Sequence, residues 1–132
     1  MNFLSNYPTE VLILLFLIVP FFQSGVDKII DWKGNLSFLK DHFKNSPFKN
    51  SVPLLLGVIL VLEIVSSIIM GFGVYELYTS GTKEIGLLGV ELCAITLTCL
   101  LIGQRLAKDY AGAMTLAVYF SIAIFGVYVL NS

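Results

Sequence analysis

Residues 52–74 have the sequence VPLLLGVILVLEIVSSIIMGFGV, in which Glu63 is the only charged residue. Eleven residues of this stretch precede Glu63 and eleven follow it, and about 20 apolar residues are enough for a helix to cross a bilayer. The stretch therefore predicts a transmembrane helix with a carboxyl group at its middle. A charged group there costs about 2.5–3.5 kcal/mol, which makes Glu63 a candidate functional residue.

The whole chain has the composition of an integral membrane protein. Of its 132 residues, 57% are hydrophobic and 13% are charged, and the mean hydropathy is +0.88. Soluble domains average about 45–50% hydrophobic residues and about 25% charged residues. The net charge of −1 gives no indication of nucleic-acid binding. Cys93 and Cys99 would lie on different faces of a helix, so we expect neither a disulfide between them nor a metal site.

Four apolar segments are each close to the length of a membrane span. They cover residues of about 9–30, 52–74, 85–103 and 110–130, and the short links between the last three require antiparallel neighbours. Helices satisfy their own backbone polar groups, as lipid demands. The sequence therefore predicts an all-α integral membrane protein, a four-helix antiparallel bundle in a single domain (residues 1–132), with the lipid bilayer as its surroundings.

The long connection between the first two spans predicts a short amphipathic helix at the membrane interface. This interfacial segment covers residues of about 35–45, with Trp32 and Phe48 as anchors and Pro47 after its end. Its apolar face is formed by residues at i, i+3 and i+7, namely Leu36, Leu39 and Phe43. His42 is expected to lie solvated on the polar face.

Positive charge is distributed unequally between the two sides of the predicted bundle. The side that holds both termini and the second connection carries only Lys83. The other side carries seven basic residues: Lys28, Lys33, Lys40, Lys44, Lys49, Arg105 and Lys108. The positive-inside rule predicts that the seven-charge side faces the cytoplasm and that both termini lie outside.

A second carboxyl group, that of Glu91, lies about three residues from the middle of the third span. Four residues of that span recur every seven positions and share one helix face: Glu84, Glu91, Thr98 and Arg105. Because lipid penalises exposed carboxyl groups, both Glu63 and Glu91 are predicted to face the bundle interior. Ser67, one turn after Glu63, extends this polar interior.

Three interpretations of the two carboxyl groups are open. In the first, each group is protonated, because burial disfavours its charge, and hydrogen-bonds across helices. In the second, the two groups share or relay a proton, in one version coupled to a bound quinone. In the third, one carboxylate pairs with a buried cation such as Lys28 or Arg105. Small residues, among them Gly57, Gly71 and Gly89, are expected to permit close helix packing.

Residues 21–30, FFQSGVDKII, resemble the F-x-x-[AS]-G-x-x-K-[IL] signature of the DoxX family. The connector from Trp32 to Pro53 and the Leu62-Glu63-Ile64 triplet resemble further elements of that family. The resemblance implies a four-helix, redox-associated protein of a bacterial inner membrane. Carried over by position, Lys28 and Glu63 are the family-like polar residues, and Gly25 permits close approach of two helices.

The resemblance does not fix a reaction, because relatives serve as small subunits of quinone-linked oxidoreductases or of other membrane complexes. Our leading hypothesis is an accessory subunit of a membrane redox or quinone-linked complex, which we expect to be non-catalytic alone. The alternative is a scaffold or assembly factor that binds a larger membrane protein. The third hypothesis is a conduit for protons or a small solute. It is less favoured than the other two, because the chain has only four predicted helices and no evident inverted repeat.

Overall fold

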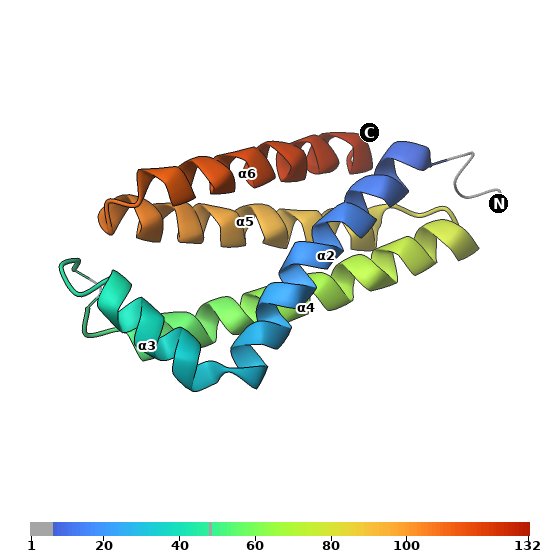
Figure 1. Ribbon diagram of the computed structural model, residues 1–132. Coiled ribbons are helices and arrows are strands. Elements are labelled where there is room, and N and C mark those ends of the chain that lie inside the picture. The colour runs from blue at the N-terminus through green and yellow to red at the C-terminus, as the bar shows by residue number, and fades with distance from the viewer. Residues whose placement is uncertain (1–6, 48) are drawn as a thin grey trace.

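A computed structural model describes residues 7–47 and 49–132, and these fold into five helices (Figure 1). Four of the helices are long and apolar enough to cross a membrane: α2 (Pro8–Ile30), α4 (Val52–Thr79), α5 (Glu84–Leu106) and α6 (Tyr110–Leu130). The fifth, α3 (Trp32–His42), is shorter. The predicted fold class is confirmed, and the protein is a multi-pass, all-α membrane bundle.

The ends of the spans agree with the predicted ends except where a helix continues past its apolar stretch. α4 runs five residues beyond Val74, because its last turn is closed by Ser80, whose backbone N–H and hydroxyl both donate to the Glu76 carbonyl. α5 continues beyond Gly103 to Leu106. Polar side chains at these ends made the sequence resemble loops, although helices commonly extend into the interfacial region of a bilayer.

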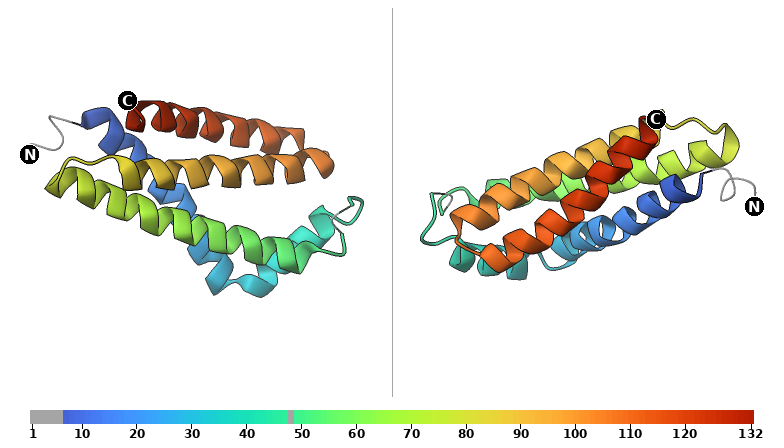
Figure 2. Two further views of the ribbon diagram at one scale, coloured as in Figure 1. Left: turned by 180° about the vertical axis from the view of Figure 1, so that it is seen from behind. Right: turned by 90° about the horizontal axis from the view of Figure 1, so that it is seen from above.

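The four long helices form a layer of three with the fourth laid across it. α4, α5 and α6 lie side by side in antiparallel order, and α2 crosses them obliquely (Figures 1 and 2). The first half of α2 meets α6, where Ile13 lies against Gly126, and its last turns meet α4 near Glu63. At the end of the bundle where α2 ends, α3 lies against α4 (Figure 1).

Apolar side chains both fill the centre of the bundle and cover its outside. The buried core is formed by residues of α2, α4, α5 and α6: Val11, Leu14, Leu17, Phe21, Met70, Leu77, Val90, Cys93, Ala94, Leu97, Ala123 and Leu130. Large apolar side chains such as Leu54, Phe72 and Met114 are more than half exposed. An apolar surface of this kind is suited to contact with lipid. Cys93 and Cys99 are both free thiols, as expected.

Close helix contacts occur at some of the predicted glycines and are absent at others. Gly89 lies directly against Met70, and the space that a Cβ of Gly25 would need is occupied by Ile64 Cδ1. The prediction is wrong for Gly71, which has nothing within 4 Å of such a Cβ, and for Gly57, whose nearest neighbour there is the Trp32 ring at 3.9 Å. Both glycines point away from the neighbouring spans.

The amphipathic helix between the first two spans is confirmed as α3, three residues nearer the N-terminus than predicted. Asp31 caps it by accepting a hydrogen bond from Gly34 N at 3.2 Å. The Asn35 side-chain amide donates to the carbonyls of Asp31 (2.8 Å) and Asp27 (3.3 Å), which joins α3 to the end of α2. Phe48, a predicted anchor, lies outside the described residues.

Candidate functional site

The charged residue near the middle of α4, Glu63, is buried and forms an ion pair with Lys28 of α2. Lys28 Nζ lies 2.8 Å from Glu63 Oε1, and the two side chains are 14% and 6% exposed. Oε1 accepts no well-aligned hydrogen bond from the described residues, so the nearby ammonium group is what compensates its charge. Of the three interpretations of Glu63, this geometry agrees with pairing to a buried cation.

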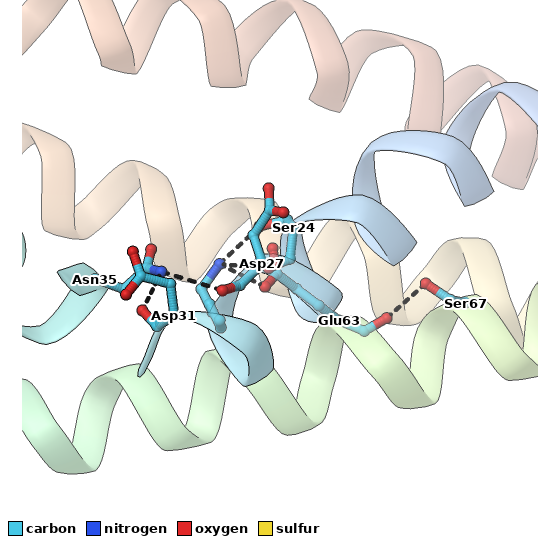
Figure 3. Close-up of polar contacts among 7 residues, drawn as sticks. Ser24, Asp27, Asp31, Asn35, Glu63 and Ser67 are labelled. Carbon is cyan, nitrogen blue, oxygen red and sulfur yellow. Dashed lines mark hydrogen bonds and ion pairs between the residues drawn. The ribbon is translucent and has the colours of Figure 1, made fainter. Parts of the chain in front are cut away.

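Two small residues of α2 permit this ion pair. Gly25 has no side chain and lies against the Ile64 side chain of α4, and this close approach brings Glu63 within reach of Lys28. Ser24 Oγ accepts a hydrogen bond from Lys28 Nζ at 2.6 Å (Figure 3), while the contact from Nζ to the Ser24 carbonyl is long, at 3.5 Å. An ammonium group has three N–H donors, and the one directed at the Ser24 carbonyl is the most weakly bound of the three.

The next turn of α4 adds two buried hydroxyl groups. Ser67 donates to the backbone carbonyl of Glu63 at 2.7 Å (Figure 3). Ser66 is completely buried, and its hydroxyl finds no hydrogen-bond partner among the described residues. Ser67 is thus in the bundle interior, as predicted, but it serves the helix backbone instead of the carboxyl group.

A cavity of about 520 Å³ lies between α3, α4 and α5, with Lys28 in its wall. Most of the wall is apolar, and it includes Leu56, Ile59 and Leu100. Val58 and Ile102 also line the cavity and are 47% and 51% exposed, so the cavity borders the lipid-facing surface. Its volume lies in the range of pockets that bind small organic molecules, about 300–1,000 Å³.

Three polar side chains line the cavity at the far end of α3. His42 Nε2 lies 3.0 Å from Gln104 Oε1 and 3.5 Å from Asp109 Oδ2. These contacts fasten α3 to α5 and to the start of α6. The expectation of a solvated His42 is wrong, since its side chain is only 23% exposed. The three residues come from separate segments, so no local sequence pattern indicated the cluster.

The remaining predicted site residues lie on the outside of α5. Glu91, Thr98 and Arg105 share one face, as their spacing predicted, but all three are exposed. The prediction that Glu91 faces the interior is therefore wrong, and Glu63 and Glu91 do not share a site. Thr98 donates to the Ala94 carbonyl of its own helix, and the Arg105 guanidinium lies over the Tyr110 ring.

A second ion pair, which the sequence did not indicate, joins the opposite end of the bundle. Lys83, just before α5, lies 2.9 Å from Glu10 Oε2 of α2, and its ammonium also lies 5.6 Å from the centre of the Tyr7 ring. The pair holds the start of α2 to the connection between α4 and α5. The two ion pairs thus fix α2 near both of its ends.

The site as a whole combines an apolar cavity, an ammonium group at one end whose charge is compensated by Glu63, and the imidazole of His42 and amide of Gln104 at the other end. Within residues 7–47 and 49–132, no group of three or more His, Cys, Asp or Glu side chains is placed to hold a metal ion. Comparison with protein-family models, curated proteins and solved structures finds no match to this chain. The function must therefore be inferred from the site itself.

Proposed function

We propose that the protein is an accessory subunit of a membrane redox complex and that its cavity holds a quinone. The observation that carries the proposal is the position of Lys28, whose ammonium group is fixed by Glu63 and Ser24 in the wall of an apolar cavity. An uncompensated lysine would be unstable at this depth, whereas the paired lysine can donate a hydrogen bond without adding net charge.

The shape and polarity of the cavity suit a quinone ring. A quinone is apolar and flat, and its two carbonyl oxygens accept hydrogen bonds at opposite ends. Lys28 offers a donor to one carbonyl oxygen at one end of α3, and His42 and Gln104 line the other end of the cavity. Because α3 has 11 residues and is about 16 Å long, the ring would bind at one of these ends and the rest of the molecule would extend along the apolar wall. Entry from the bilayer would pass Val58 and Ile102, where the cavity borders the lipid-facing surface. When bound, the quinone would supply the electron-accepting chemistry; the chain's own residues bind and orient it.

The DoxX-like signature supports the same proposal. Residues 21–29 place Gly25 and Lys28 on one side of the contact, and the Leu62-Glu63-Ile64 triplet places the carboxylate on the other. The resemblance therefore covers the residues that meet in space at this site. It also suggests a bacterial inner membrane, in which the lysine-rich end of the bundle, with α3, would face the cytoplasm.

A role as scaffold or assembly factor for a larger membrane protein is the second candidate function. The observation in its favour is Glu91, a carboxyl group exposed on the membrane-facing side of α5. A docking surface of this kind would serve an accessory subunit equally well.

The cavity proposal can be tested with the only tryptophan of the chain, Trp32, which lies at the start of α3. Quinones quench indole fluorescence at short range, so a short-chain benzoquinone titrated into nanodiscs that hold the protein should quench Trp32 saturably. Ile59→Phe fills the cavity and should weaken the apparent Kd at least about tenfold, or about 1.4 kcal/mol.

The matched control is Val61→Phe, because Val61 lies on the same helix, is 59% exposed and does not line the cavity. It should bind like the unaltered protein. Equal quenching curves for the unaltered protein and both variants would mean that the quinone dissolves in the lipid and does not occupy the cavity.

A further inference from the structure

Glu91 lies at membrane depth on the outer face of α5, where residues 7–47 and 49–132 give its side chain no ion-pair partner. It is four residues from the middle of α5 (Glu84–Leu106), or about 6 Å along the helix axis. The hydrocarbon core extends about 15 Å to each side of its midplane, and a glutamate is too short to reach the interface from there. The residues one turn away on either side, Leu88 and Ile95, are apolar and at least half exposed.

No basic residue within the described part of the chain is placed to compensate this charge. Lys28 is already paired with Glu63, and Lys83 is paired with Glu10 at the end of the bundle. Arg105 shares the face of Glu91 but lies 14 residues away, about 21 Å along the helix, and stacks on Tyr110. To be ionised at this depth, an exposed carboxyl group therefore requires a cation from another molecule.

We infer that the outer face of α5, formed by Leu88, Glu91, Ile95 and Thr98, docks a transmembrane helix of a partner protein that carries a lysine or arginine at the depth of Glu91. Leu88 and Ile95 would pack against the partner helix, and the ion pair would set its register. Inside the bundle, the charge of Glu63 is compensated in the same way, because Nζ of Lys28 on a neighbouring helix lies 2.8 Å from Glu63 Oε1. The inference rests on the accessory-subunit part of the proposed function.

A second copy of the chain suits this face less well than a different protein does. Two copies related by a two-fold axis along the membrane normal would place the α5 faces together and bring Glu91 near its own counterpart. Two carboxylates would then share one site in lipid with no cation from the described part of the chain, because Lys28 is committed to Glu63. A basic partner helix removes this conflict.

Photo-crosslinking in native membranes tests the inference. A photoreactive amino acid replaces Ile95 on the proposed docking face or, as a control, Val118, which is 59% exposed on α6. We expect a product with another protein from position 95 only, and its linked peptide should lie in a transmembrane segment that contains Lys or Arg. Glu91→Gln should reduce this product at least tenfold, whereas Glu84→Gln, on the same face but at the helix end, should leave it unchanged.

Charge reversal provides the decisive comparison. Glu91→Lys should abolish the product, and changing the partner's basic residue to glutamate should restore it in the Glu91→Lys background. A product with a second copy of the chain, a partner segment without a basic residue, or a yield insensitive to Glu91→Gln would each overturn the inference and leave the quinone cavity untouched. If neither position yields a protein product, the inference and the accessory-subunit role both fail.

Discussion

Lys28 and Glu63 each carry a charge into the part of the bundle where a single charge is most costly. These two charges are stabilised in the bundle interior by the 2.8 Å contact between Lys28 Nζ and Glu63 Oε1 and by the hydrogen bond from Lys28 to Ser24 Oγ. A buried ion pair of this kind adds little net stability compared with an apolar pair, but each partner needs the other. At the scale of residues, stability therefore does not explain the pair, whereas the proposed hydrogen bond from Lys28 to a ligand in the cavity would explain it.

Removing only one partner should be far more harmful than removing both. Lys28→Met leaves Glu63 uncompensated and should lower the free energy of unfolding by about 3–5 kcal/mol, measured by denaturant titration in detergent with circular dichroism. The double variant Lys28→Met/Glu63→Leu should recover most of that loss. Lys33→Met, which alters an exposed lysine, serves as the control. A single variant no less stable than the double variant would show that the pair is not charge-coupled.

The sequence predicted this part of the site only as one of three alternatives. It placed Glu63 and Lys28 in neighbouring spans, but the contact depends on the crossing point of α2 and α4, which Gly25 and Ile64 set in space. No spacing within one segment carries that information. The polar cluster of His42, Gln104 and Asp109 escaped sequence analysis for the same reason.

At the scale of elements, apolar length predicted every span, but it did not predict which way each span faces. α5 shows the difficulty, because the seven-residue spacing placed Glu91 and Arg105 on one face without saying where that face points. A usable signal was present in the small residues Gly86, Gly89 and Cys93, which mark the packed side of the helix. Glu91 is two residues after Gly89, or about 200° around the helix, and therefore faces outward.

Two glycines of α4 should respond in opposite ways to the same substitution. A Cβ added to Gly73 would lie 2.5 Å from Gly86 Cα, so Gly73→Ala must separate α4 from α5 and should cost about 1–3 kcal/mol. Gly71 faces open space, so Gly71→Ala should be neutral or stabilise by up to about 1 kcal/mol. Thermal unfolding in detergent measures both. Equal melting temperatures for the two variants would contradict the close approach at Gly73.

The contacts of His42 should hold α3 over the cavity. His42→Ala removes the contacts to Gln104 and Asp109 and should raise amide hydrogen exchange in α3 at least tenfold, as measured by mass spectrometry. Lys40→Ala, an exposed substitution in the same helix, should leave exchange unchanged. If the His42 variant exchanged no faster than the Lys40 variant, the contacts of His42 would not be what holds α3 in place.

At the scale of the whole molecule, the four spans place α3 and most of the basic residues at one end and the connection between α4 and α5 at the other. We predict that the lysine-rich end faces the cytoplasm. In a background with Cys93→Ala and Cys99→Ala, a membrane-impermeant thiol reagent applied to intact cells should label Thr82→Cys and not Asn45→Cys. The opposite labelling pattern would reverse the orientation.

The central claim for the molecule is that the cavity beside Lys28 and Glu63 holds a quinone. The most direct measurement is the quinone content of the protein extracted from its native membrane in polymer nanodiscs, quantified by mass spectrometry against total lipid. The unaltered protein and Val61→Phe should carry quinone well above its proportion in the bulk membrane, whereas Ile59→Phe should carry only the bulk proportion. Equal quinone content in all three proteins would contradict the claim.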